Sequence, residues 1–102
     1  MTQLDLSAMQ SSAEQVEALL SLLANRHRLM VMCHLMDGEK TAGELLERSS
    51  LSQSALSQHL GKLRDNQLVT TRRRGQNIHY SIASEEAQVL IETLCQLYKP
   101  DN

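Results

Sequence analysis

Residues 51–63 read LSQSALSQHLGKL, so the triplet Leu-Ser-Gln occurs twice within eight residues. The two triplets start five residues apart, which on an α-helix rotates them by about 140° and places them on different faces. Ser52 in the first triplet is a good N-cap, and Leu56, Leu60 and Leu63 then recur at helical spacing. The stretch therefore predicts one amphipathic helix that starts after Ser52 and buries its leucine stripe.

The opposite face of this predicted helix carries serine and glutamine rather than the charged residues of the first and last helices. Short hydroxyl and amide side chains can hydrogen-bond base edges in the major groove of DNA. A solvated amphipathic helix explains the leucines equally well, but it explains this exposed composition less well. The predicted DNA-facing residues of the helix are Gln53, Ser54, Ser57, Gln58, His59 and Lys62.

The residues before this helix predict a second, shorter helix joined to it by a tight turn. Thr41 followed by Glu44 is a capping-box pattern, and Ser49-Ser50 interrupts the apolar positions that follow. The helix that starts after Ser52 is predicted to end near Asn66. A short helix, a turn of three or four residues and a polar-faced helix indicate a helix-turn-helix over about residues 41–66.

The residues after it predict a basic β-hairpin. Two β-leaning runs, 69–73 and 78–82, flank Arg74-Gly75-Gln76 as the turn. A hairpin in this position, over about residues 68–82, completes a winged helix-turn-helix, and its arginines can reach backbone phosphate or a minor groove. The predicted DNA contacts of the wing are Arg72, Arg73, Arg74 and Gln76.

Three further helices are predicted outside this unit. Ser11 or Ser12 caps a first helix over about 11–24, and Asn25 caps a second whose apolar residues lie nearly all round it, as in a buried central helix. Ser84 caps a last helix over about 84–98, which Pro100 closes. The apolar stripe predicted for this last helix consists of Val89, Leu90, Leu94 and Leu97.

The expected fold is mainly α with a small β-hairpin, in the order ααααββα, as one domain over residues 1–102. The hydrophobic content is 41%, and the only aromatic residues of the Phe, Trp and Tyr type are two tyrosines, which favours an aliphatic core of packed helices. The sequence contains no apolar run of about 18 residues and no basic-then-apolar secretion signal at its start. We therefore expect a cytoplasmic protein without a membrane segment.

The net charge of −2 conceals a basic segment inside an acidic chain. Residues 52–82 contain five basic side chains and one acidic side chain, a balance of +4, whereas the rest contains five basic and eleven acidic side chains, a balance of −6. Such a segment suggests an anionic partner, although a solvated surface segment can have the same composition.

Residues 26–80 resemble the ArsR family of bacterial winged-helix regulators. The resemblance rests on NRHRLMVMCHL, on TAGELLERSSLSQSALSQHLGKLRDNQLV and on RRRGQNIHYSI, and its most characteristic part is Ser57-Gln58-His59-Leu60 followed by Leu-Arg and Leu-Val. With its flanking helices the chain is most similar to the HlyU/BigR/SqrR-like branch. The resemblance implies a homodimeric repressor-type regulator, with the first and last helices at the interface, that binds a palindromic site in double-stranded DNA.

The same resemblance implies no metal site. One family site uses thiolates on the third helix, where this chain has Thr41 and Gly43. A second site needs Asp, His, His and Glu, which cannot be assembled from the side chains at the matching positions. Those positions hold Ser84, Glu86, Leu97 and Pro100. Neither a metal nor another cofactor is therefore expected.

Two cysteines remain as candidate redox-sensing residues, Cys33 and Cys95. In the branch that the chain resembles, several members sense persulfides or oxidants through a pair of cysteines, and Cys33 matches the first of them. Lys99 stands where the second is expected, and Cys95 lies one helical turn, roughly 6 Å, earlier. Because a disulfide needs Cα atoms within about 7 Å, dithiol sensing, sensing by a single thiol and absence of any signal all stay open.

No pattern in the sequence indicates an enzyme, since the four glycines are dispersed and no catalytic constellation is recognisable. The expected function is a sequence-specific DNA-binding regulator. The alternatives are a winged-helix module that binds proteins and a signal-independent antirepressor.

Overall fold

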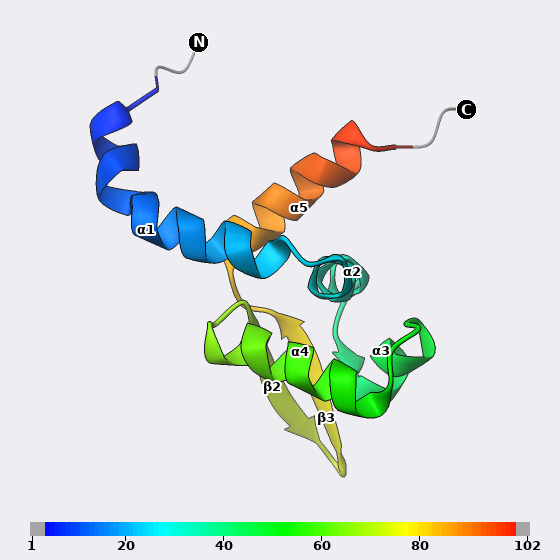
Figure 1. The fold of residues 1–102 in the computed structure, drawn as a ribbon. Helices are drawn as coiled ribbons and strands as arrows, with labels where there is room; N and C mark the ends of the chain where they lie inside the picture. Colours follow the sequence, from blue (N-terminus) through cyan, green and yellow to red (C-terminus); the bar gives the residue numbers. More distant parts are fainter. Residues whose placement is uncertain (1–3, 100–102) are drawn as a thin grey trace.

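The computed structural model describes residues 4–99, which form a winged helix fold of five helices and a three-stranded antiparallel sheet (Figure 1). The elements are α1 (Leu6–Leu23), α2 (Arg26–Leu35), β1 (Lys40–Thr41), α3 (Ala42–Glu47), α4 (Gln53–Asp65), β2 (Val69–Arg74), β3 (Asn77–Ile82) and α5 (Glu85–Leu97). The predicted fold class is confirmed, with the two-residue strand β1 as an addition. Pro100, the predicted end of the last helix, lies outside the described residues.

Helix α1 starts earlier than predicted. Its N-cap is Asp5, whose carboxylate accepts a hydrogen bond from the backbone N–H of Ala8 at 3.0 Å. Ser11, a predicted cap, instead lies inside the helix and donates its hydroxyl to the carbonyl oxygen of Ala8 at 3.0 Å. The prediction of a helix over 11–24 was therefore wrong at its start, because a serine in a helix can bond to a preceding carbonyl as readily as it can cap.

Helix α2 is central, but contrary to the prediction it is not buried all round. Asn25 caps it by accepting hydrogen bonds from the backbone N–H groups of His27 and Arg28, at 3.0 and 3.1 Å. Met32 is fully buried, whereas Met30 is 47% exposed and lines an open groove beside α3. One side of α2 thus faces the core and the other borders solvent, a difference that an unbroken apolar run does not reveal.

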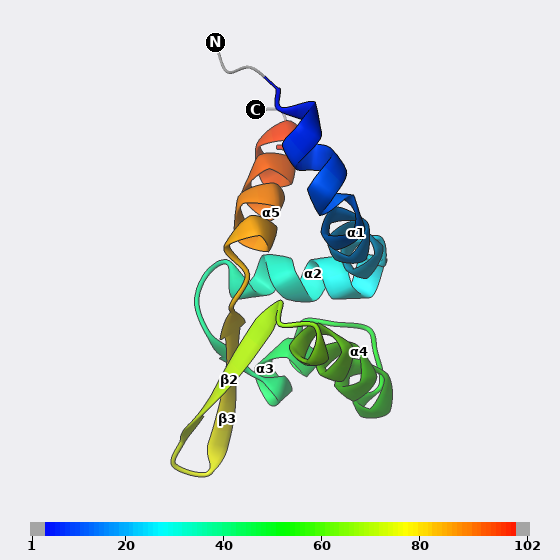
Figure 2. The same ribbon diagram turned by 90° about the vertical axis from the view of Figure 1, so that its left-hand side faces the viewer.

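The leucine stripe of α4 is buried as predicted: Leu56, Leu60 and Leu63 are at most 2% exposed. They share one core with Met32 of α2 and Leu45 of α3. Because this stripe is held on the core, the remaining surface of α4 has a fixed direction relative to α3 and the sheet. Figure 2 shows α3 and α4 below α2, away from the ends of the chain.

Helix α5 uses a different face for the core than the predicted stripe. Ala87 and Ile91 are fully buried, whereas Val89 is 56% and Leu97 is 70% exposed. Ser84 caps the helix as predicted, since its hydroxyl accepts from the backbone N–H of Ala87 at 3.1 Å. Leu90 of the predicted stripe packs against the core, whereas Val89 and Leu97 remain exposed, so α5 carries a second apolar face.

The hairpin has a tighter turn than predicted. Arg74 pairs with Asn77 at the end of the strands, so the turn consists of Gly75 and Gln76 alone and Arg74 belongs to β2. Gly75 has φ +63°, which glycine tolerates without strain, as the first turn residue of a two-residue hairpin often requires. On its other edge, β3 pairs with β1, which has no sequence signal because two residues form no pattern.

The end of α4 carries an unusual residue. The backbone N–H of Leu68 bonds to the carbonyl of Leu63 at 2.9 Å, and that of Gln67 bonds to Arg64 at 3.0 Å, which is a Schellman motif. Gln67 occupies the left-handed position of this motif with φ 64°, where glycine is the usual residue. A β-carbon at this φ is disfavoured, so Gln67 stores backbone strain.

We expect Gln67→Gly to raise the free energy of unfolding by up to about 1 kcal/mol, because glycine relieves the left-handed strain. Gln67→Ala is the matched control, since it removes the same side chain and keeps the β-carbon. Chemical denaturation of both variants measures the difference. Equal stability of the two variants would contradict strain at this position.

Candidate nucleic-acid interface

The helix-turn-helix is fixed by local hydrogen bonds at each of its joints. Thr41 and Glu44 form the predicted capping box: the Thr41 backbone N–H donates to Oε1 of Glu44 at 2.9 Å, and the Glu44 N–H donates to Oγ1 of Thr41 at 3.1 Å. In the turn, the Ser49 hydroxyl donates to the carbonyl of Leu46. Ser52 then caps α4 through Ala55 at 3.1 Å. The turn therefore sets the angle between α3 and α4.

The predicted reading face of α4 is exposed to solvent. This face consists of Gln53, Ser54, Ser57, Gln58 and Lys62, all of which are exposed, in contrast to the three buried leucines of the helix. Their hydroxyl, amide and ammonium groups provide donors and acceptors suited to base edges and phosphate. Its composition and its exposure together make this face a candidate base-reading surface.

His59 is set apart from that face. It is only half-buried, but its ring lies beside that of His27, with 5.8 Å between the ring centroids, and its Nδ1 is 3.5 Å from a guanidinium nitrogen of Arg28. Arg28 is itself buried and donates to the carbonyl oxygens of Leu22 and Ser21 at 2.7 and 3.4 Å. His59 is thus directed toward the junction of α1 and α2.

The environment of His59 favours its neutral form. Burial lowers the pKa of its imidazole, and the neighbouring positive charges of Arg28, His27 and Lys62 lower that pKa further. A neutral imidazole can accept the hydrogen bond from the Arg28 guanidinium, which an imidazolium cannot. The hydrogen bond between Arg28 of α2 and His59 of α4 therefore requires the neutral form of His59.

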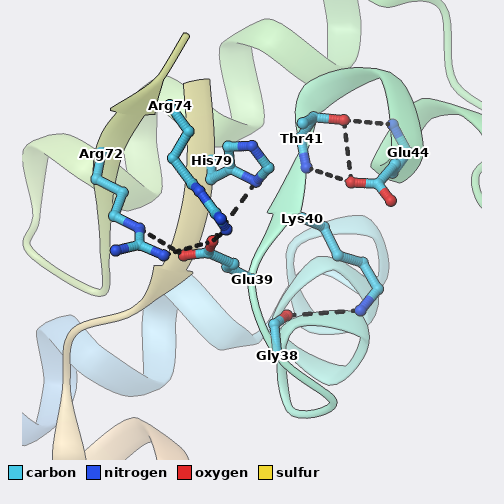
Figure 3. A network of polar contacts seen from close by, with 8 residues as sticks. All are labelled: Gly38, Glu39, Lys40, Thr41, Glu44, Arg72, Arg74 and His79. Atoms are coloured by element: carbon cyan, nitrogen blue, oxygen red, sulfur yellow. Dashed lines mark hydrogen bonds and ion pairs between the residues drawn. The ribbon is translucent and has the colours of Figure 1, made fainter. Parts of the chain in front are cut away.

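The arginines of the wing divide between the two faces of the hairpin. Figure 3 shows Arg72 and Arg74 directed toward Glu39, which immediately precedes β1. Arg72 binds the Glu39 carboxylate through Nε and Nη2, both at 3.0 Å, and Arg74 binds it through Nη1 at 3.0 Å. Arg73 does not join this group, and its Nε donates to the carbonyl of Gly75 at 3.3 Å.

Glu39 is the residue of this surface that the sequence did not reveal. Hydrogen bonds from Arg72 hold the pKa of its carboxyl below the usual value, and Arg74 and the nearby His79 act in the same direction. Nδ1 of His79 lies 3.7 Å from the carboxylate. Arg72 and Arg74 lie on one face of β2, although Arg74 was predicted in the turn, and only the unpredicted pairing of β1 with β3 brings Glu39 to them.

The reading face and the wing lie at the same end of the molecule. In Figure 2, α4 and the hairpin project on either side of α3, at the end opposite the two chain termini. Gln76, the remaining predicted wing contact, is exposed at the hairpin tip. This arrangement places a polar helix face and a basic hairpin on one side, where both can meet one extended partner.

The opposite end of the molecule exposes apolar side chains on two helices. Leu6, Met9 and Leu20 on α1 and Val89 and Leu97 on α5 are between 49% and 74% exposed. Leu22 and Leu23 of α1, by contrast, belong to the core. The exposed apolar residues of α1 and α5 thus recur along two helices, unlike the single scattered apolar residues that are normal on a protein surface.

The two cysteines are neighbours in the structure. Cys33 on α2 is half-buried and Cys95 on α5 is exposed. Burial raises the pKa of the Cys33 thiol, and the adjacent Cys95 thiol raises it further through its charge and a hydrogen bond. The Cys33 and Cys95 thiols are thus close enough to influence one another, although Cys95 lies one helical turn before Lys99.

Two kinds of feature are absent from residues 4–99. In this part of the chain, no three side chains of the His, Cys, Asp or Glu type group closely enough to hold a metal ion. None of the helices there is long and apolar enough to cross a membrane.

Comparison with known proteins gives consistent matches over most of the chain. The family "Bacterial regulatory protein, arsR family" matches residues 25–71. The transcriptional activator HlyU of Vibrio cholerae is 43% identical over 93% of this chain and 88% of its own length. The structure of its reduced form has a TM-score of 0.85, over 91% of this chain and 98% of that one.

Two further solved structures extend the comparison. The transcriptional repressor BigR from Xylella fastidiosa is 34% identical, with a TM-score of 0.88 over 96% of this chain and 100% of that one. The homodimeric winged helix-turn-helix DNA-binding domain Mb0332 from Mycobacterium bovis is 25% identical, with a TM-score of 0.74 over 95% and 89% of the two chains. The fold is thus shared with regulators of transcription.

We expect acid to destabilise the wild-type protein more than a His59→Gln variant. Because the pKa of His59 is lowered on folding from its ordinary value of 6.5, the unfolded chain binds the proton more readily. Stability contributed by neutral His59 is therefore complete above about pH 6.5 and is lost as the pH falls below it. Glutamine keeps an acceptor for Arg28 and does not titrate. Denaturation between pH 7.5 and 5.5 measures this, and equal slopes for both proteins would refute it.

Proposed function

Because the chain belongs to the ArsR family of bacterial regulatory proteins and is a DNA-binding transcriptional regulator, we propose that α4 is its base-reading helix. The observation that carries this proposal is the exposed serine and glutamine face of a helix anchored by three buried leucines. In the proposal, Gln53, Ser54, Ser57 and Gln58 contact base edges, and Lys62 contacts phosphate. His59 supports the helix from its inner side, through Arg28, instead of reading bases.

The wing is proposed to contact the DNA backbone. Arg73 is exposed and is the wing arginine not bound to Glu39, so it is available to phosphate at once. Arg72, Arg74 and Gln76 lie on the same hairpin and extend the contact toward the next phosphate or the minor groove. These contacts add affinity that does not depend on base sequence.

The protein is proposed to act as a homodimer through α1 and α5. The exposed apolar residues of these two helices lie at the end away from α4 and the wing. A two-fold dimer formed there would present two copies of α4 to successive major grooves of a palindromic site. Such a dimer acts in the cytoplasm, where bacterial DNA lies, and the proposal includes no metal, cofactor or catalytic step.

We expect two variants to separate base reading from backbone binding. Changing Arg72, Arg73 and Arg74 together to Ala should weaken binding to every duplex and reduce the salt slope by about 0.9 for each phosphate that the wing no longer neutralises. Gln58→Ala should change the sequence recovered from a random duplex pool, with little effect on bulk DNA. Titrations at several salt concentrations and selection from the pool measure both effects.

Each variant can refute one of the two proposed contacts, that of the wing or that of α4. A triple variant whose salt titration overlays that of the wild type would show that the wing does not touch DNA. A Gln58→Ala variant that loses equal affinity for selected and random duplexes would show that this residue does not read bases.

The neighbouring thiols support a proposed redox response. With a peroxide as oxidant, the Cys33 and Cys95 thiols would form one disulfide while the peroxide is reduced to water. Each thiol gives up its hydrogen, the S–S bond forms and the O–O bond breaks. The bond would join α2 to α5, and α2 packs on the reading helix. A persulfide donor is the second reagent to test.

Mass spectrometry after peroxide treatment should show a loss of two hydrogens in the protein, accompanied by a change in DNA affinity in the same sample. Cys33→Ser and Cys95→Ser are the matched controls, and neither can form the bond. An unmodified protein, or a modified protein with unchanged DNA binding, would eliminate the thiol response.

A further inference from the structure

The ion pairs between Glu39 and two wing arginines suggest a control on DNA affinity. We propose that Glu39 competes with DNA phosphate for Arg72 and Arg74 and so lowers the affinity of the wing for any duplex. This inference rests on the proposed contact between the wing and DNA. It adds a residue that acts on the strength of binding and not on the choice of sequence.

The geometry of the cluster supports competition. The Glu39 carboxylate binds Arg72 with two parallel hydrogen bonds of 3.0 Å and Arg74 with one. A phosphate group offers the same pair of oxygens to a guanidinium fork, so both anions need the same donors. DNA can reach these donors from outside, because the side chains of Arg72 and Arg74 are 63% and 59% exposed while that of Glu39 is 24% exposed.

Charge supports the same inference. Arg72 and Arg74 carry two positive charges, and Glu39 leaves a net charge of +1 for the three groups. The fourth group at the cluster, His79, lies 3.7 Å from the carboxylate and adds positive charge only when protonated. A wing that the sequence presents as three adjacent cations therefore meets DNA with one carboxylate among them.

The wing does not depend on Glu39 for its position. Its strands are held by backbone pairing from Val69 with Ile82 to Arg74 with Asn77, and β1 pairs with the far side of β3. Exposed ion pairs stabilise a fold little and weaken with salt. The arginines can therefore exchange Glu39 for phosphate while the hairpin stays in place.

The test compares two charge-neutralising variants of the full-length protein. Glu39→Gln removes the competing charge and keeps the shape of the side chain. Glu47→Gln is the matched control, because Glu47 is exposed on α3 near the same end and forms no ion pair within residues 4–99. We expect Glu39→Gln to bind a random duplex about three- to tenfold more tightly than Glu47→Gln, the range for loss of a few surface ion pairs. Its salt slope should be steeper.

A third variant assigns the effect to the arginines. In a background with Arg72→Ala and Arg74→Ala, the Glu39→Gln change should no longer raise affinity, since a pairwise effect vanishes when its partner is removed. Thermal melting of each variant confirms that the compared proteins are folded. Fluorescence anisotropy with a labelled duplex at three or more salt concentrations provides the affinities.

Each outcome distinguishes this inference from the proposed function. If the double arginine variant binds DNA as well as the wild type, Arg72 and Arg74 do not contact phosphate and their part of the proposed wing contact fails. If it binds more weakly but Glu39→Gln and Glu47→Gln are equal, only the competition is overturned. If Glu39→Gln binds DNA more weakly than Glu47→Gln, Glu39 orients the arginines for phosphate and the inference is wrong in sign.

Discussion

Burial of the leucine stripe of α4 is the constraint on which the rest of the molecule depends. Leu56, Leu60 and Leu63 pack into the same core as α2 and α3, and that packing fixes which side of α4 faces outward. Removing a buried leucine from such a core typically costs about 2–5 kcal/mol, a large share of the stability of a small domain. The polar side chains of α4 are therefore not needed to hold the helix on the core, because the buried leucines do so.

The parts of the fold that local chemistry determines could be predicted from the sequence. The capping box at Thr41, the caps at Asn25, Ser52 and Ser84, and the buried stripe of α4 all depend on residues a few positions apart. The start of α1 was wrong because Asp5 and Ser11 both suit a cap. Long-range pairing escaped prediction most completely: β1 is too short for a pattern, and Glu39 meets Arg72 across more than thirty residues of chain.

Charged side chains gather in two clusters, one buried and one at the surface. At one, Arg28 donates to two carbonyl oxygens of α1 and approaches the imidazole of His59, so a positive charge lies on the inner side of α4. At the other, Glu39 gathers cations from the wing into a single group. Counting charges over residues 52–82 omits Glu39, which the fold places beside the arginines of the wing. The folded chain also buries Arg28 and leaves Arg72 and Arg74 exposed.

The strained link at Gln67 has a mechanical consequence. Leu68 is bonded through its N–H to the last turn of α4, and its carbonyl accepts from the backbone of Ala83 and Ser84 after β3. The link between α4 and β2 is thus hydrogen-bonded on both sides, which limits how far the helix and the hairpin can move relative to one another. The proposed base contacts of α4 and the proposed phosphate contacts of the wing are thus separated by a span that this link sets. A duplex whose groove width departs from that span must deform or forgo one set of contacts, so DNA shape enters the choice of site.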